Sequence, residues 1–289
     1  MKTVGRAETW TYFDEQSKIK KASNSVVRGA PGHPVSSYLE LAKKVAELQF
    51  RNPEHVLLFR GQTHDYKNQK KNTTLKPSLF RHRKLDGFRP PSSSVLIERF
   101  NRLKTAEDGL TRLFNEQSLE GRHRLQRHRI LRWSIAQHYE LCATPLLDVT
   151  QSIRIAASFA SDGTEEEAFF YVLAVPNISG AITASAEAEL QIVRLAGICP
   201  PLAVRPHIQE GYLLGEYPDL PDFDQKQLYS SYEIDFGRRV IAKFRINVGA
   251  FWRNKDFRQV PHAALYPDSH DDLFQLIKAL KSPYQQESA

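Results

Sequence analysis

The spacing of apolar residues changes between the two halves of this 289-residue chain. In the first half, apolar side chains recur at the spacing of a helix with one buried face, at residues 35–50, 90–110 and 130–141. The second half instead contains β-branched or aromatic runs bounded by turn residues, which predict strands, at residues 168–175, 189–195 and 238–247. Helices followed by strands favour an α+β fold over a doubly wound parallel sheet. We therefore expect a single α+β domain whose helices, largely in the N-terminal half, pack on a mixed or antiparallel sheet.

Residues 1–34 have a different character from the rest of the chain. They combine small and basic residues with Gly and Pro, and they show no sustained period. This composition predicts an extended or loosely attached N-terminal arm, with the domain itself formed by residues 35–289. Neither a GxGxxG sequence nor a GxxxxGK[ST] sequence occurs, so the common nucleotide-binding folds have no support.

The composition also indicates a compartment. No stretch approaches the ~18 consecutive apolar residues that a membrane span requires, and the N-terminal residues lack the apolar run of a secretory signal. The two cysteines, Cys142 and Cys199, form no CxxC pair and have no histidine at metal-ligand spacing. We therefore expect a cytoplasmic protein without a disulfide framework, a metal ion or a membrane partner.

Basic residues are concentrated in the first half of the chain. Residues 1–140 contain 27 Lys/Arg against 14 Asp/Glu, whereas residues 141–289 contain 13 against 19. The positive charge is densest in two places, one at residues 67–84 and one comprising Arg122, Arg124, Arg127, Arg129 and Arg132. Such a stretch attracts polyanions, so RNA or DNA is the expected partner. The alternative is a solvated face that only keeps the protein soluble.

Several short motifs follow one another along the chain. They are Phe59-Arg60-Gly61, residues 75–81 (LKPSLFR), 136–139 (AQHY), 146–150 (LLDVT) and 265–268 (LYPD). In this order they resemble the FRG-domain family, which is named for the first motif, and the resemblance extends over residues 35–280. The family usually has His-x-Gly before its Leu-Leu-Asp motif. This chain instead reads His138-Tyr139-Glu140, without the glycine and with an apparent extra residue before Leu146.

A second and weaker resemblance is to ADP-ribosyltransferases. It rests on the order of an arginine at a strand end, a Thr/Ser segment before an Ala-x-x-Phe-Ala helix, and an acid near a late strand. The resemblance implies that NAD is the substrate and that Arg60 holds an NAD phosphate as a charged fork. Thr150 or Ser152 would orient the ribose. Glu210 or Gln209 would hold the ribose hydroxyls while an oxocarbenium-like cation forms, although the transferases separate these two positions by one residue.

The site residues that this resemblance implies fall into two groups. The catalytic group is Arg60, Thr150, Glu210 and His138. The NAD-binding group is Arg60, Gly61, Gln62, Asp148, Ser152 and Gln209. Each has a structural alternative, such as an ion pair for Arg60, a hydrogen-bonded helix position for His138, or a helix cap for Asp148. Tyr66 and Tyr139 are candidates to stack on a ring of NAD, or else to pack in the core.

These features predict an NAD-dependent, ADP-ribosyltransferase-like enzyme that modifies nucleic acid or a nucleic-acid-associated protein. Such an activity needs control, so the expected context is a toxin–antitoxin or phage-defence system with a cognate inhibitor protein as partner. The alternatives are a non-catalytic nucleic-acid-binding module and a protein-interaction domain.

Overall fold

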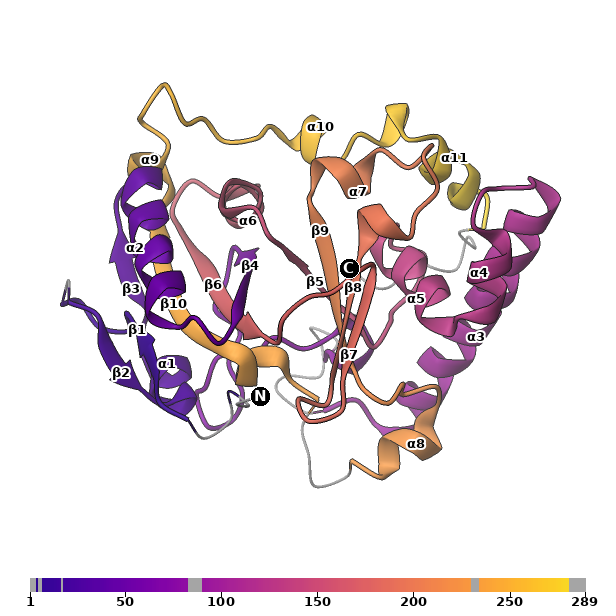
Figure 1. The fold of residues 1–289 in the computed structure, drawn as a ribbon, viewed down its shortest axis with the longest axis horizontal. Helices are drawn as coiled ribbons and strands as arrows, with labels where there is room; N and C mark the ends of the chain where they lie inside the picture. The colour runs from indigo at the N-terminus through magenta and orange to yellow at the C-terminus, as the bar shows by residue number, and fades with distance from the viewer. Residues whose placement is uncertain (1–3, 5–6, 17, 83–89, 230–233, 281–289) are drawn as a thin grey trace. The chain divides into compact units, whose positions relative to one another are not determined.

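The computed structural model describes residues 4, 7–16, 18–82, 90–229 and 234–280. Contacts divide the chain into two compact units, each assembled from three separate segments. Unit 1 comprises Met1–Leu75, Val149–Ser179 and Asp235–Leu265, and unit 2 comprises Lys76–Asp148, Gly180–Ile234 and Tyr266–Ala289. Both units combine helices with β-strands (Figure 1), which confirms the α+β class.

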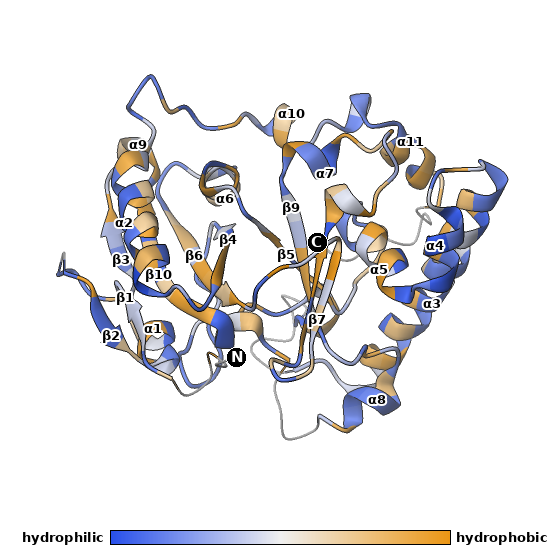
Figure 2. Ribbon diagram, in the orientation of Figure 1, coloured by the Kyte–Doolittle hydropathy of each residue, from blue (hydrophilic) through white to orange (hydrophobic). Residues whose placement is uncertain are grey.

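The strands of unit 1 follow the order β3-β10-β6-β4-β5. They are β3 (His33–Val35), β4 (Val56–Gln62), β5 (Leu147–Thr150), β6 (Glu167–Val175) and β10 (Val240–Asn247). β10 is parallel to β3 and antiparallel to β6, so the sheet is mixed. β4 is antiparallel to both β6 and β5. Figure 2 shows β6 as apolar along most of its length, and all but two of its residues are buried.

The helices of unit 1 are α1 (Asn24–Gly29), α2 (Tyr38–Arg51), α6 (Ile153–Ser161), α9 (Val248–Phe251) and α10 (His262–Leu265). Of these, α2, α6 and α9 contribute side chains to the apolar core on one face of the sheet. The start of α2 is capped reciprocally, because the Ser37 hydroxyl accepts from the Glu40 amide and the Glu40 carboxylate accepts from the Ser36 amide. Apolar side chains of α2 and α6 share one core with β4, β6 and β10.

The glycine of the Phe-Arg-Gly motif allows α6 to lie close to β4. A Cβ atom at Gly61 would be 1.9 Å from the Ala156 carbonyl oxygen and 2.6 Å from the Ala160 amide nitrogen. Both contacts are with backbone, which cannot move aside as the end of a side chain can. α6 therefore packs directly against β4 because Gly61 has no side chain and because α6 presents the small residues Ala156 and Ala160 to it.

The described residues before position 35 are packed into unit 1, whereas the sequence predicted a loosely attached arm. β1 (Thr9–Thr11) and β2 (Lys20–Ala22) form an antiparallel pair, and the expected boundary between residues 34 and 35 falls inside β3. Val4 and Tyr12 are buried in the same core as α2. Strands of three residues are too short to show a period, which is why the sequence did not indicate them.

Unit 2 contains three antiparallel strands and the longest helix of the described chain, α3 (Ser93–Glu116). The strands are β7 (Ile182–Ser185), β8 (Leu190–Arg194) and β9 (Gly211–Glu216). α3, α4 (Arg122–Arg127) and α5 (Arg129–His138) lie side by side (Figure 1). The shorter helices are α7 (Arg205–Ile208), α8 (Phe223–Gln227) and α11 (Asp272–Lys278). Within the described ranges, no helix has the length and apolar character needed to cross a membrane.

Candidate functional site

The face of the unit 1 sheet opposite its apolar core carries a row of polar side chains. In the strand register, Arg60 of β4 is paired with Tyr171 of β6, which is paired with Lys243 of β10. Side chains alternate between the two faces of a sheet, and the neighbours Phe59 and Phe170 point into the apolar core. The arginine of the Phe-Arg-Gly motif therefore lies on a polar sheet face, near the end of a strand as predicted.

Asp65, in the loop that follows β4, supplies the negative charge of this row. Its carboxylate accepts hydrogen bonds from Thr73 Oγ1 at 2.7 Å, Lys243 Nζ at 2.9 Å and the Tyr171 hydroxyl at 3.1 Å. Lys243 has 0% exposure, and burial lowers the pKa of its ammonium group while the Asp65 carboxylate opposes that change. Burial, and then Asp65, raise the pKa of the Tyr171 hydroxyl. A buried ion pair thus organises the row.

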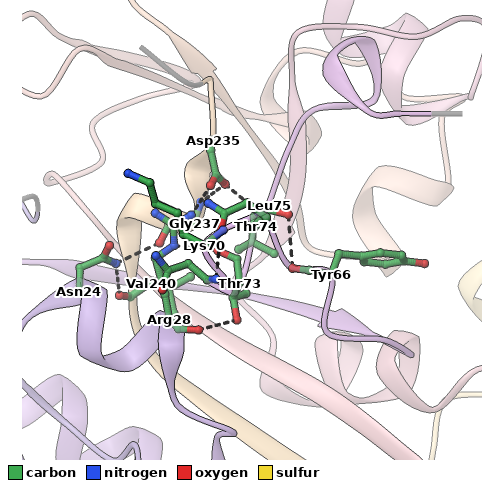
Figure 3. Close-up of polar contacts among 12 residues, drawn as sticks. Asn24, Arg28, Tyr66, Lys70, Thr73, Thr74, Leu75, Asp235, Gly237 and Val240 are labelled. Carbon is green, nitrogen blue, oxygen red and sulfur yellow. Dashed lines mark hydrogen bonds and ion pairs between the residues drawn. The ribbon is translucent and has the colours of Figure 1, made fainter. Parts of the chain in front are cut away.

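The same loop is attached to the rest of unit 1 at its far end (Figure 3). Arg28 donates from Nε to the Thr73 carbonyl at 2.7 Å and forms an ion pair with Asp235. The Asp235 carboxylate also accepts from the Leu75 amide at 2.7 Å. In Figure 3 the ring of Tyr66 points away from these contacts, and this residue is 58% exposed. The loop therefore holds an exposed aromatic ring on a fixed backbone.

Five of the predicted site residues lie in unit 1: Arg60, Gly61, Gln62, Thr150 and Ser152. Arg60 and Gln62 are half-buried, and Gln62 Oε1 has no hydrogen-bond partner among the described residues. Thr150 is paired with Phe59 across β4 and β5. Its hydroxyl accepts from the Ser152 amide at 3.1 Å, and the Ser152 hydroxyl caps α6 by accepting from the Ile155 amide at 3.4 Å. Both hydroxyls therefore help to position the start of α6.

His138 ends α5 inside unit 2, where it is 3% exposed. Burial, with a smaller contribution from the charge of Arg205, lowers the pKa of its imidazole well below the ordinary value. The next residue, Tyr139, has 0% exposure and donates to the Asp271 carboxylate at 3.0 Å. The expectation that Tyr139 stacks on a ligand ring is therefore wrong, and its alternative, packing in the core, is correct.

The neutral His138 makes the stability of the protein depend on pH. Below about pH 6.5 an unfolded histidine binds a proton, whereas the buried imidazole does not. The unfolded state then binds more protons, so the free energy of unfolding decreases as the pH is lowered. His138 contributes up to about 1.4 kcal/mol per pH unit to this decrease. We expect urea unfolding to show that the stability difference between wild type and His138→Asn is smaller at about pH 5.5 than at about pH 7.5. A difference that does not change with pH would contradict a buried neutral imidazole.

The remaining predicted residues of unit 2 have different environments. The Asp148 carboxylate accepts from Gln137 Nε2 of α5 at 2.6 Å, a hydrogen bond within unit 2. Gln209 is buried at the end of α7, whereas Glu210 is exposed and has a φ of 46°. That Arg60, Thr150 and Glu210 share one cleft stays a prediction.

The sequence did not single out Arg205, which begins α7. Its guanidinium is 6% exposed, donates to the Glu140 carboxylate at 2.9 Å and lies 4.6 Å from the centre of the Tyr266 ring. The Arg205 amide is also bound, at 2.8 Å, by the Asp271 carboxylate that caps α11. The segment at residues 205–211 (RPHIQEG) resembles an R…Q-x-G segment of the FRG-domain family, but the burial of its arginine cannot be read from sequence.

The arginines of the basic stretch divide into structural and exposed residues. Arg132 is bound by the Glu107 carboxylate at 2.9 Å and by the carbonyl of Leu125 at 2.7 Å, so it holds α4 and α5 against α3. Arg129 also contacts Glu107, at 3.4 Å. The side chains that face solvent are therefore mainly those of α4, which Figure 2 shows as hydrophilic: Arg122, Arg124 and Arg127, with Arg122 partly covered.

Residues 55–168 match the model of the FRG-domain family. The matched region runs from the start of β4 through α3, α4, α5, β5 and α6 to the first residues of β6. Residues 55–168 are therefore an FRG domain within an α+β protein. Comparison with curated proteins and with solved structures returned no match. The resemblance to ADP-ribosyltransferases therefore rests on the order of residues alone.

Proposed function

We propose that this FRG-domain protein is an NAD-consuming, ADP-ribosyltransferase-like enzyme in which Arg60 holds the diphosphate of NAD. The observation that carries the proposal is the position of Arg60 in the Arg60–Tyr171–Lys243 row, on the polar face of the sheet. A half-buried guanidinium next to polar neighbours binds phosphate more strongly than a solvated one, because water competes less for its hydrogen bonds.

Other side chains of unit 1 fit a ligand with phosphate, ribose and aromatic parts. Gln62 follows Arg60 on the same face of β4 after one intervening residue, and its Oε1 atom can accept from a ribose hydroxyl. Tyr66 presents an exposed ring on the fixed loop, suited to stacking on a base. In the reaction, the bond between ribose C1′ and the nicotinamide nitrogen breaks. Nicotinamide leaves, and an acceptor nucleophile loses its proton and bonds to C1′.

The acceptor in this proposal is nucleic acid or a protein bound to it. The exposed arginines Arg124 and Arg127 on α4 favour a polyanion, with Arg122 as a further contact. The same observation supports the second candidate function, a non-catalytic nucleic-acid-binding module. The two candidates differ in whether NAD is consumed. A toxin or phage-defence role with a cognate inhibitor protein would follow from the enzymatic activity, because uncontrolled loss of NAD harms the cell.

Turnover of NAD distinguishes the two functions. The full chain is incubated with NAD labelled in its adenylate phosphate, together with total RNA, DNA or cell protein, and both released nicotinamide and transferred label are measured. We expect wild type to release nicotinamide and Arg60→Ala to lose at least about 10-fold in rate, as expected when a charged hydrogen bond is removed. The control is Arg253→Ala, which removes an exposed arginine of unit 1 that donates to the Gly249 carbonyl at 3.2 Å.

The double variant Arg124→Ala/Arg127→Ala assigns the acceptor. If nucleic acid is modified, this variant should keep its release of nicotinamide to water but transfer less label to RNA or DNA. Salt-sensitive RNA binding without any turnover of NAD would establish the binding module instead. Equal rates for wild type and Arg60→Ala would remove Arg60 from the mechanism.

A further inference from the structure

The end of α5 has the geometry of a Schellman motif. The Leu141 amide donates to the Ala136 carbonyl at 2.8 Å, and the Glu140 amide donates to the Gln137 carbonyl at 3.1 Å. The residue after the C-cap of this motif adopts a left-handed conformation, and it is usually glycine. Here it is Glu140, with a φ of 54°. A side chain in this conformation costs about 1 kcal/mol.

The side chain of Glu140 compensates a buried charge. Its carboxylate accepts from Arg205 Nη2 at 2.9 Å, and its own side chain remains 63% exposed while that of Arg205 is only 6% exposed. A cation removed from water needs an anion nearby. A carboxylate that stays mostly in water is a replaceable partner, because another anion can supply the charge that the buried guanidinium needs.

Two polar atoms beside this pair have unused hydrogen-bonding capacity. Arg205 Nε and His138 Nε2 are both buried and have no hydrogen-bond partner among the described residues. Arg205 lies close enough to His138 to lower the pKa of the imidazole, and the ring edge of His138 faces the start of β9 at Gly211. The Nη2 donor of Arg205 is bound to Glu140, and its Nε donor is unoccupied within the described part of the chain. An anion with two or more oxygens could accept from both donors, whereas Glu140 accepts from only one.

We propose that Arg205 forms the floor of an oxyanion-binding site that Glu140 occupies in the free protein, and that an external phosphate or carboxylate group displaces Glu140. Tyr266 holds the guanidinium plane by stacking, and His138 borders the site. The incoming oxyanion accepts hydrogen bonds from Nε and Nη2 of Arg205, and the Glu140 side chain is released to water. This site uses residues of unit 2 alone, so it does not depend on the proposed role of Arg60.

Binding of inorganic phosphate by the full chain tests this site. Phosphate is titrated calorimetrically at constant ionic strength into wild type, Glu140→Gln and Glu140→Gly, with acetate titrated separately to distinguish phosphate from carboxylate ligands. If Glu140 occupies the site about nine-tenths of the time, removing it should tighten phosphate binding about 10-fold. Glu116→Gln, at an exposed position on α3, is the control and should bind phosphate as wild type does.

A third variant tests whether Arg205 is the group that binds phosphate. Glu140→Gln/Arg205→Lys keeps the positive charge but loses the planar fork, and we expect it to lose the 10-fold gain. Equal phosphate affinity in wild type, Glu140→Gln and Glu140→Gly would overturn the proposal and leave Glu140 as a structural partner. Tight binding that persists in Glu140→Gln/Arg205→Lys would overturn it as well, because the oxyanion would then bind elsewhere.

Discussion

Gly61→Ala should destabilise the protein by about 3 kcal/mol, a large part of the total stability of an ordinary domain. The new methyl group would lie 1.9 Å from the Ala156 carbonyl oxygen and 2.6 Å from the Ala160 amide nitrogen. Neither atom can rotate away, so α6 must move as a body and separate from the core that it shares with β4. Urea unfolding monitored by circular dichroism measures the loss.

Gly109→Ala provides the matched control for this prediction. Gly109 lies inside α3, and a Cβ atom there would be 3.7 Å from the nearest atom, a methyl carbon of Leu280, which is ordinary contact. The same substitution should therefore stabilise the protein by about 0.5–1 kcal/mol, because alanine favours a helix interior. A loss at Gly61 no greater than about 1 kcal/mol would contradict the close approach of α6 to β4.

Asp65→Ala should cost about 3–5 kcal/mol, because it leaves the ammonium of Lys243 buried without its carboxylate. Lys243 has 0% exposure, and its other contacts are neutral oxygens, Thr73 Oγ1 at 2.8 Å and the Arg28 carbonyl at 3.4 Å. Lys243→Met should also destabilise, whereas the double variant Asp65→Ala/Lys243→Met should cost less than the sum of the two single variants. The expected coupling energy is about 2–3 kcal/mol by denaturant unfolding.

An exposed ion pair serves as the comparison. Arg102 and Glu98 form a pair on α3 in which the side chains are 47% and 50% exposed. Arg102→Ala should change the stability by less than about 0.5 kcal/mol. If the Asp65 and Lys243 substitutions were additive, the two groups would not be coupled and Lys243 would have to be neutral or solvated in the folded protein.

Much of the fold could be predicted from the sequence because hydrophobic period is a local property. The helix predicted at residues 35–50 is α2, and the strands predicted at 168–175 and 238–247 are β6 and β10. The elements that the sequence did not indicate include the short strands up to residue 35 and β9, which contains Gly211 and Gly215. Three residues are too few for a period, and glycine weakens the strand signal in β9.

The site was predicted less completely than the fold, for a physical reason. Arg60 could be predicted as a site residue because a charged residue directly after an apolar run is evident from a few neighbouring residues of the sequence. The partners that define its surroundings could not, since Asp65 and Lys243 are 178 residues apart. The pair of Glu140 and Arg205 is separated by 65 residues, and it depends on the left-handed turn after α5. Burial and pairing across such distances follow from tertiary packing, which residue spacing does not encode.

Binding of NAD to the full chain is the most direct test of the role of Arg60. Calorimetric titration of NAD should give saturable binding in wild type and in Arg253→Ala. We expect the affinity to be about 10- to 100-fold weaker in Arg60→Ala, and still weaker than wild type in Arg60→Lys, which keeps the charge but not the fork. NAD that fails to bind wild type, or that binds wild type and Arg60→Ala equally, would contradict the account.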